Sequence, residues 1–134
     1  MAGQGEAASR NLTGVWSGRY FYPRELEPVS FVATLIETAT SLTGATHEPA
    51  GPATAAVRYA TLQGQRDGNS VSFIKTYDIA GSSVDPIHYS GILNGDATEI
   101  EGTWRIPGNW SGKFLMIRSP GKVAAVARKV AERV

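Results

Sequence analysis

The chain has 134 residues, of which 42% are hydrophobic and 19% are charged, with a net charge of +1 and no cysteine. This length and composition predict a single globular domain and exclude a disordered chain or a coiled coil. The lack of thiols excludes disulfides, thiolate zinc sites and iron–sulfur clusters, and we expect no cofactor.

The beginning of the chain is small and polar. We interpret residues 1–11 as a disordered leader, because chain ends of this composition seldom pack. Met1 to Arg10 contains no apolar segment of the kind found in secretory signals. No run of about 18 apolar residues follows it, so we expect no membrane insertion and a cytoplasmic location.

Residues 12–118 have the texture of a β domain, in which short β-branched and aromatic runs alternate with Gly, Pro, Asn and Asp. Turns such as Asp67-Gly68-Asn69 suit tight hairpins. Eight such runs are typical of an up-and-down barrel that closes around side chains or one small ligand. We therefore predict an all-β, eight-stranded antiparallel up-and-down barrel, with strands at 13–22, 29–38, 41–48, 56–65, 70–78, 86–93, 98–106 and 110–118.

The end of the chain has a different pattern. Ser119 and Pro120 are a typical helix start, and valines then recur at helical spacing. We predict a short amphipathic α-helix over residues 119–134, which could seal one barrel end or form a homodimer. Residues 120–134 carry a charge of +3 and residues 1–119 carry −2, so the barrel has no basic face for nucleic acid.

The first and last predicted strands share a pattern. Residues 16–21 read Trp-Ser-Gly-Arg-Tyr-Phe, and residues 110–115 read Trp-Ser-Gly-Lys-Phe-Leu. A closed up-and-down barrel pairs its first strand with its last. The glycines, Gly18 and Gly112, share a face with the aromatic residues and would allow sharp coiling at that seam.

Two short motifs add a family resemblance. Gly14-Val15-Trp16 opens the first run, and Gly102-Thr103-Trp104 lies in the seventh. With a Gly-x-Trp on the first strand of such a barrel, the chain resembles the calycins, namely lipocalins, fatty-acid-binding proteins and avidins. It looks like a bacterial family of this kind. The resemblance implies a barrel with an internal pocket, in which Trp16 closes one end and Arg118 packs over it.

Period-two alternation identifies candidates for a ligand pocket. Lys75 shares a face with Phe73 and Tyr77, and a buried lysine would need a carboxylate such as Glu37 or a bound anion. Alternatively, the opposite face of that run, which carries Ile74, is inside and Lys75 is solvated. On the first interpretation, the residues that face one interior pocket are Tyr20, Lys75, Tyr77, Tyr89 and Trp104.

His47 and Glu48 lie where the third run meets a loop. We include both as ligand-contacting residues near the rim, against the alternative of a solvated strand end. The pattern favours a protein that binds a small, mostly apolar ligand in the barrel, with no catalytic residue. Two alternatives stay open: an isomerase or cyclase that uses the cavity, and an assembly protein with a filled barrel.

Overall fold

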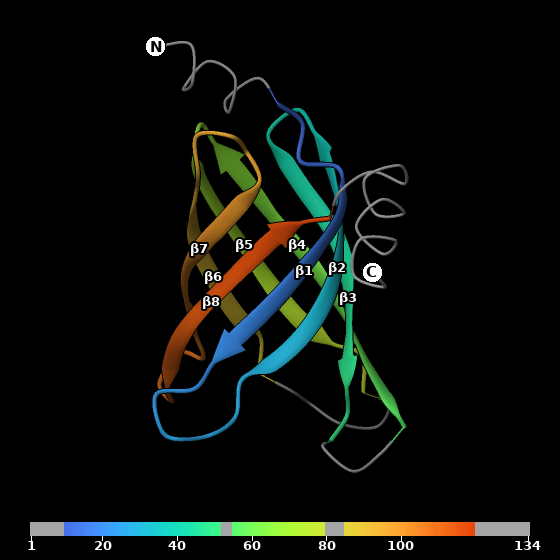
Figure 1. Ribbon diagram of the computed structural model, residues 1–134, viewed down its shortest axis with the longest axis vertical. Helices are drawn as coiled ribbons and strands as arrows, with labels where there is room; N and C mark the ends of the chain where they lie inside the picture. The colour runs from blue at the N-terminus through green and yellow to red at the C-terminus, as the bar shows by residue number, and fades with distance from the viewer. Residues whose placement is uncertain (1–9, 52–54, 80–84, 120–134) are drawn as a thin grey trace, which may run out of the picture.

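The computed structural model describes residues 10–51, 55–79 and 85–119. Eight strands form one closed antiparallel barrel in which each strand pairs with its neighbours in sequence (Figure 1). The prediction of an all-β up-and-down barrel is therefore confirmed. The first and last residues of every strand lie within two residues of the predicted positions. The strands are β1 (Gly14–Phe21), β2 (Val29–Thr38), β3 (Ser41–Pro49), β4 (Val57–Asp67), β5 (Ser70–Tyr77), β6 (Ile87–Leu93), β7 (Glu99–Arg105) and β8 (Ser111–Arg118).

The two chain ends lie partly outside the described residues. Of the predicted leader, residues 1–9 fall outside, while the Arg10 guanidinium donates a hydrogen bond to the carbonyl of Asp96 (2.7 Å). The helix predicted over residues 119–134, with its role in a homodimer, lies outside the described residues except for Ser119. Within the part of the chain that the structure describes, no helix is long and apolar enough to cross a membrane.

The barrel closes where β1 pairs with β8, as the repeated pattern predicts. Trp16 lies opposite Arg118, and Tyr20 lies opposite Phe114. Gly18 faces inward at this seam, and a Cβ there would overlap the ring of Phe31 from β2. The missing side chain therefore lets an aromatic ring lie directly over the strand, which is one use of glycine in a tightly coiled barrel.

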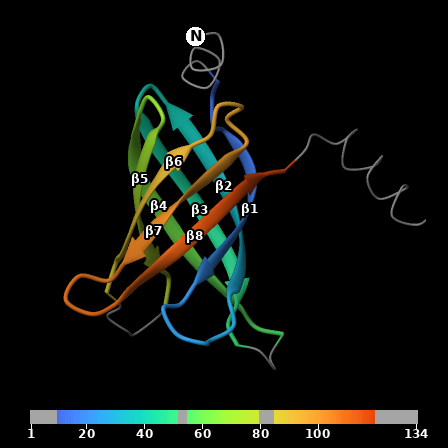
Figure 2. The same ribbon diagram turned by 60° about the vertical axis from the view of Figure 1, so that its left-hand side comes forward.

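The two ends of the barrel differ (Figure 2). One end, which we call the plugged end, is covered by the chain before β1. The other end, which we call the mouth, has the connections that follow β1 and β7 at its edge (Figure 1). Because neighbouring strands are antiparallel, the odd-numbered strands end at the mouth and the even-numbered strands begin there.

Trp16 and Leu12, both fully buried, close the plugged end. The Trp16 indole N–H donates to the carbonyl of Leu12 (3.0 Å), and the Arg118 guanidinium carbon lies 5.5 Å from the centre of the Trp16 ring. Arg118 also donates to the carbonyls of Asn11 and Thr13 (2.8 and 2.9 Å). This is the arrangement of tryptophan and arginine that the calycin resemblance implies.

Candidate functional site

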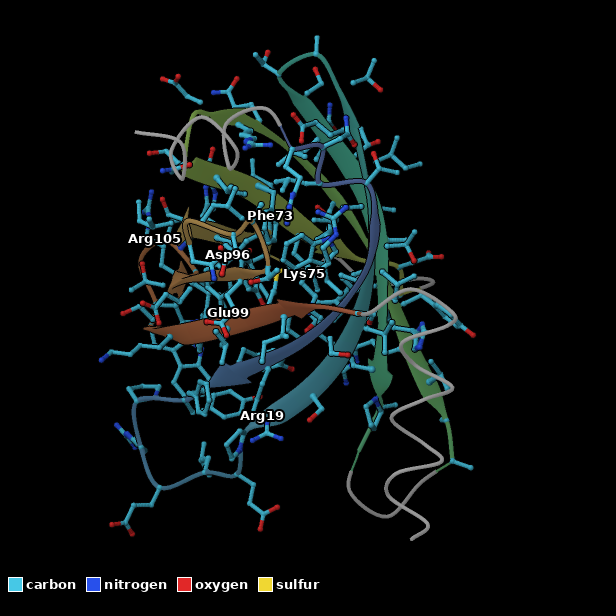
Figure 3. All side chains as sticks on the ribbon, turned by 45° about the horizontal axis from the view of Figure 1, so that its top comes forward. Arg19, Phe73, Lys75, Asp96, Glu99 and Arg105 are labelled. Atoms are coloured by element: carbon cyan, nitrogen blue, oxygen red, sulfur yellow. The ribbon has the colours of Figure 1, made fainter. Side chains whose placement is uncertain are left out.

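Lys75 is an interior residue, 1% exposed, and its ammonium nitrogen lies 2.7 Å from Oε1 of Glu48. Figure 3 shows Lys75 within the ring of strands. The expectation that Lys75 faces the interior and meets a carboxylate is confirmed. Glu37, the partner suggested from the sequence, instead pairs with Arg66 at the plugged end (3.0 Å).

The Glu48 carboxylate organises a buried cluster. The Tyr20 hydroxyl donates to Oε2 (2.6 Å), and the Tyr77 hydroxyl donates to Oε1 (3.0 Å), the atom that also accepts from Lys75. With three donors from two strands, Tyr20 on β1 and Lys75 and Tyr77 on β5, the buried charge of Glu48 is well compensated. We call Tyr20, Glu48, Lys75 and Tyr77 the polar cluster.

Aromatic rings surround the ammonium of Lys75. Its nitrogen lies 4.9 Å from the ring centres of both Tyr20 and Tyr77. It lies 4.7 Å from the ring centre of Phe31 and 5.8 Å from that of Tyr89. The negative faces of such rings attract a cation, so they add to the stabilisation by Glu48.

Burial shifts the titration of this cluster. Loss of solvation lowers the pKa of Lys75 from its ordinary value, although the nearby Glu48 charge partly opposes this. Burial also raises the pKa of Tyr20, an effect reinforced by its hydrogen bond to Glu48. The pKa values of Tyr77 and Tyr89 are raised mainly by burial as well, so all three phenols stay protonated in the folded protein near neutral pH.

A cavity of about 140 Å³ lies beside the polar cluster, on the side of the mouth. Three aromatic rings meet there. Tyr22 and Trp110 stack on one another, with ring centres 5.1 Å apart and planes at 28°. The Trp104 ring is nearly perpendicular to both, at 86° to Tyr22 and 89° to Trp110. The Trp104 indole N–H is held by the carbonyl of Phe21 (3.0 Å), which fixes that ring. We call this space the mouth cavity; it is lined by Tyr20, Tyr22, Arg58, Tyr77, Ile87, Tyr89, Trp104, Ile106 and Trp110.

The structure separates the residues that the sequence grouped together. Tyr20, Tyr77, Tyr89 and Trp104 all line the mouth cavity, whereas Lys75 lies among the rings beside it and is not a lining residue.

His47 and Glu48 do not share an environment either. Glu48 is at a strand end, as expected, but it is 3% exposed and points inward to Lys75, so it does not lie on the rim. His47 is exposed on the outer face of β3, where its ring lies 6.4 Å from that of Tyr59. Successive residues of a strand point to opposite faces, which is the reason for this split.

A larger hollow, of about 780 Å³, lies on the outer surface over β1, β2 and β8. Its lining includes His47 and outward-facing side chains such as Ser17, Val32 and Ile117, and it also reaches Glu48 and Phe31 at the end of the barrel wall. Tyr20, Lys75 and Tyr77, the other members of the polar cluster, do not line it. We place the candidate site at the mouth cavity, where buried polar groups and aromatic rings converge.

Sequence reasoning missed several residues of the mouth cavity, of which Arg58 is the most important. Its guanidinium carbon lies 5.2 Å from the Tyr77 ring centre, and it donates a long hydrogen bond to the carbonyl of Ala50 (3.4 Å). The signal was available, because Arg58 is in period-two phase with the buried Ala60 and Leu62. An arginine at the first interior position of a strand would have indicated a charge at the barrel opening.

No protein-family model matches the chain, and no curated protein is significantly similar to it. Within residues 10–51, 55–79 and 85–119, no three His, Asp or Glu side chains are placed so that they could hold a metal ion.

Proposed function

We propose that the protein is a calycin-like barrel that binds a small, mostly apolar ligand in the mouth cavity. The observation that carries the proposal is the cavity of about 140 Å³, in which the Trp104 ring is nearly perpendicular to the stacked rings of Tyr22 and Trp110. A ring that is perpendicular to its neighbours, as Trp104 is here, allows a planar guest to contact both ring faces and ring edges. The phenol hydroxyls of Tyr20 and Tyr77 supply polar groups beside it.

The volume limits the size of the ligand. Pockets for drug-sized molecules are roughly 300–1,000 Å³. An apolar protein cavity of about 150 Å³, by contrast, binds benzene. With about 140 Å³, the mouth cavity matches a molecule of one ring with a small substituent. Long lipids and multi-ring compounds would not fit within it.

The calycin affiliation is part of the same proposal. It is supported by the eight-stranded up-and-down topology together with Trp16 and Arg118 at the plugged end. With that end closed by a fully buried tryptophan, a ligand would enter at the mouth.

The test uses benzyl alcohol, a neutral single-ring molecule, with heteronuclear NMR of the three indole N–H groups. Binding should shift the resonances of Trp104 and Trp110, which line the cavity, and leave Trp16 at the plugged end unchanged. For a ligand this small we expect a dissociation constant on the order of 1 mM. Unchanged Trp104 and Trp110 resonances up to the solubility limit of benzyl alcohol would overturn the proposal.

A pair of variants locates the binding. Ile106→Trp should fill the mouth cavity, which Ile106 lines, and abolish the shifts. Ile36→Trp is the matched control, because Ile36 is 51% exposed on the outer face of β2 and contributes nothing to the cavity. Both proteins should keep the β-sheet circular dichroism of the parent, and only the first should lose benzyl alcohol binding.

A further inference from the structure

The mouth cavity contains an excess positive charge. Of its nine lining residues, Arg58 alone carries a formal charge at neutral pH. The charges of the polar cluster beside it cancel, because Lys75 forms its ion pair with Glu48 at 2.7 Å. Together, Glu48, Lys75 and Arg58 leave a net charge of +1 at this end of the interior.

Arg58 is held in place without a carboxylate partner. In the described ranges, the ion pairs join Arg66 to Glu37 and Lys75 to Glu48, and Arg58 forms none. Its contacts are the Tyr77 ring at 5.2 Å and the Ala50 carbonyl at 3.4 Å. A half-buried guanidinium with five N–H donors therefore faces the cavity with most of its hydrogen-bonding capacity available.

The positive charge of Arg58 extends into the polar cluster. It contributes to lowering the pKa of Lys75 and opposes the rise in the pKa of Tyr77. Both effects have the sign that a cation exerts on its neighbours. A negative charge placed beside Arg58 would also favour the charged form of Lys75. Glu48 is directly opposite Arg58 on β3, so the attraction to the anion comes from the excess of two cations over one carboxylate.

We infer that the ligand of the mouth cavity is a single-ring aromatic monoanion of the benzoate type, with its carboxylate on Arg58. Its ring would lie among Tyr22, Trp104 and Trp110, and its carboxylate would accept the paired N–H donors of the guanidinium. This inference rests on the proposed function and adds the sign of the charge and the anchoring residue.

The aromatic lining could also suit an organic cation, because rings of this kind form cages for ammonium groups. Arg58 argues against that occupant, since a second cation in the cavity would be repelled by the guanidinium. The one ammonium that the rings do surround, that of Lys75, is already neutralised by Glu48.

Three probes of nearly equal shape distinguish these ligands by isothermal titration calorimetry: benzoate, neutral benzamide and cationic benzylamine. Benzoate should bind about 10–100-fold more tightly than benzamide, the range expected for hydrogen bonds to a charged group. Benzylamine should bind more weakly than benzamide. In Arg58→Gln, the preference for benzoate should vanish while benzamide binding is retained.

Arg105→Gln is the matched control, because Arg105 is an exposed arginine on the outer side of β7 (Figure 3). It removes the same charge without touching the cavity, so its preference for benzoate should equal that of the parent. Equal loss in both variants would mean that general surface charge, and not contact with Arg58, selects the anion.

The outcomes separate the two levels of inference. If benzamide binds as well as benzoate, or benzylamine binds best, the anionic ligand class is overturned while ligand binding in the cavity stands. If none of the three probes binds at millimolar concentrations, the proposed function itself fails.

Discussion

The ion pair between Lys75 and Glu48 yields a prediction in which a second substitution repairs the first. Lys75→Met keeps an unbranched apolar side chain among the surrounding rings but removes the ammonium 2.7 Å from Glu48. The remaining carboxylate belongs to a side chain that is only 1% exposed. Removing one partner of a buried pair costs about 3–5 kcal/mol, because the other charge stays buried without compensation.

The structure places the expected cost at the lower end of that range. Glu48 keeps two hydrogen bonds, from the hydroxyls of Tyr20 and Tyr77, when Lys75 is replaced. We expect Lys75→Met to lower the free energy of unfolding by about 3 kcal/mol. Adding Glu48→Gln removes the orphaned charge and leaves an amide that both phenols can still contact. The double variant should therefore recover about 2 kcal/mol of that loss.

Urea denaturation at neutral pH, followed by tryptophan fluorescence, measures all the variants. The denaturant dependence should be the same throughout, which shows that the barrel still unfolds as a unit. A double variant that is less stable than Lys75→Met alone would refute the reasoning, because Glu48 would then not be an uncompensated charge in the single variant.

Arg66 and Glu37 at the plugged end provide the comparison. Glu37 is more exposed than Glu48, at 11% of its side chain, and it also accepts the backbone N–H of Leu12. Its charge is better solvated when the arginine is lost. Adding Glu37→Gln to Arg66→Met should therefore recover less than about 1 kcal/mol.

Two further predictions concern the plugged end and the phenols. Trp16→Ala should cost about 3–5 kcal/mol of unfolding free energy, because the ring is fully buried; a thermal unfolding midpoint equal to that of the parent would contradict this. The pKa values of Tyr20, Tyr77 and Tyr89 are raised above the ordinary 10.0. Above pH 10.0, the unfolded chain therefore releases protons that the folded barrel retains. The free energy of unfolding then falls by about 1.4 kcal/mol per pH unit for each phenol. The lowered pKa of Lys75 acts in the opposite direction only up to its ordinary 10.5. In an alkaline titration, the phenolate absorbance of these three tyrosines should rise together with the loss of β-sheet circular dichroism. Phenolate formation while the barrel is still intact would contradict this, because it would show that the three hydroxyls are accessible to solvent.

The barrel itself was predictable because the alternation in its strands is clear. In β7, Ile100 and Trp104 are buried while Glu99 and Glu101 are exposed, as their pattern indicates. One buried face and one solvated face fix the register of each strand, since a slip of one residue would expose the whole apolar set. The hairpin turns then fix the order of the strands.

The partner of Lys75 was missed although the topology contained the information. Glu37 and Glu48 are both near the end of a strand and both in phase with inward-facing residues. Strand β2 runs to the plugged end, whereas β3 and β5 both run to the mouth, so Glu48 and Lys75 are the two that meet. Strand direction, and not alternation alone, decides which buried acid reaches a buried base.

The size of the mouth cavity could not be predicted from the pattern. Period-two alternation places rings on the inner face, but their packing depends on side-chain rotamers and on residues outside the strands. Tyr22 follows β1, and Ile106 and Trp110 lie in the connection between β7 and β8. These three residues surround the opening, and no strand periodicity applies to them.

The polar cluster connects the stability of the barrel to its proposed function. A buried ion pair is often no more stable than well-packed apolar residues of the same volume, so stability alone does not explain its presence. Here Glu48 accepts hydrogen bonds from the two phenols, Tyr20 and Tyr77, whose rings form part of the wall of the mouth cavity. An apolar residue at position 48 would leave both hydroxyls without their carboxylate acceptor and free to reorient. The pair thus keeps the wall in one arrangement and cancels its own charge, so that Arg58 alone determines the charge that the cavity presents to a ligand.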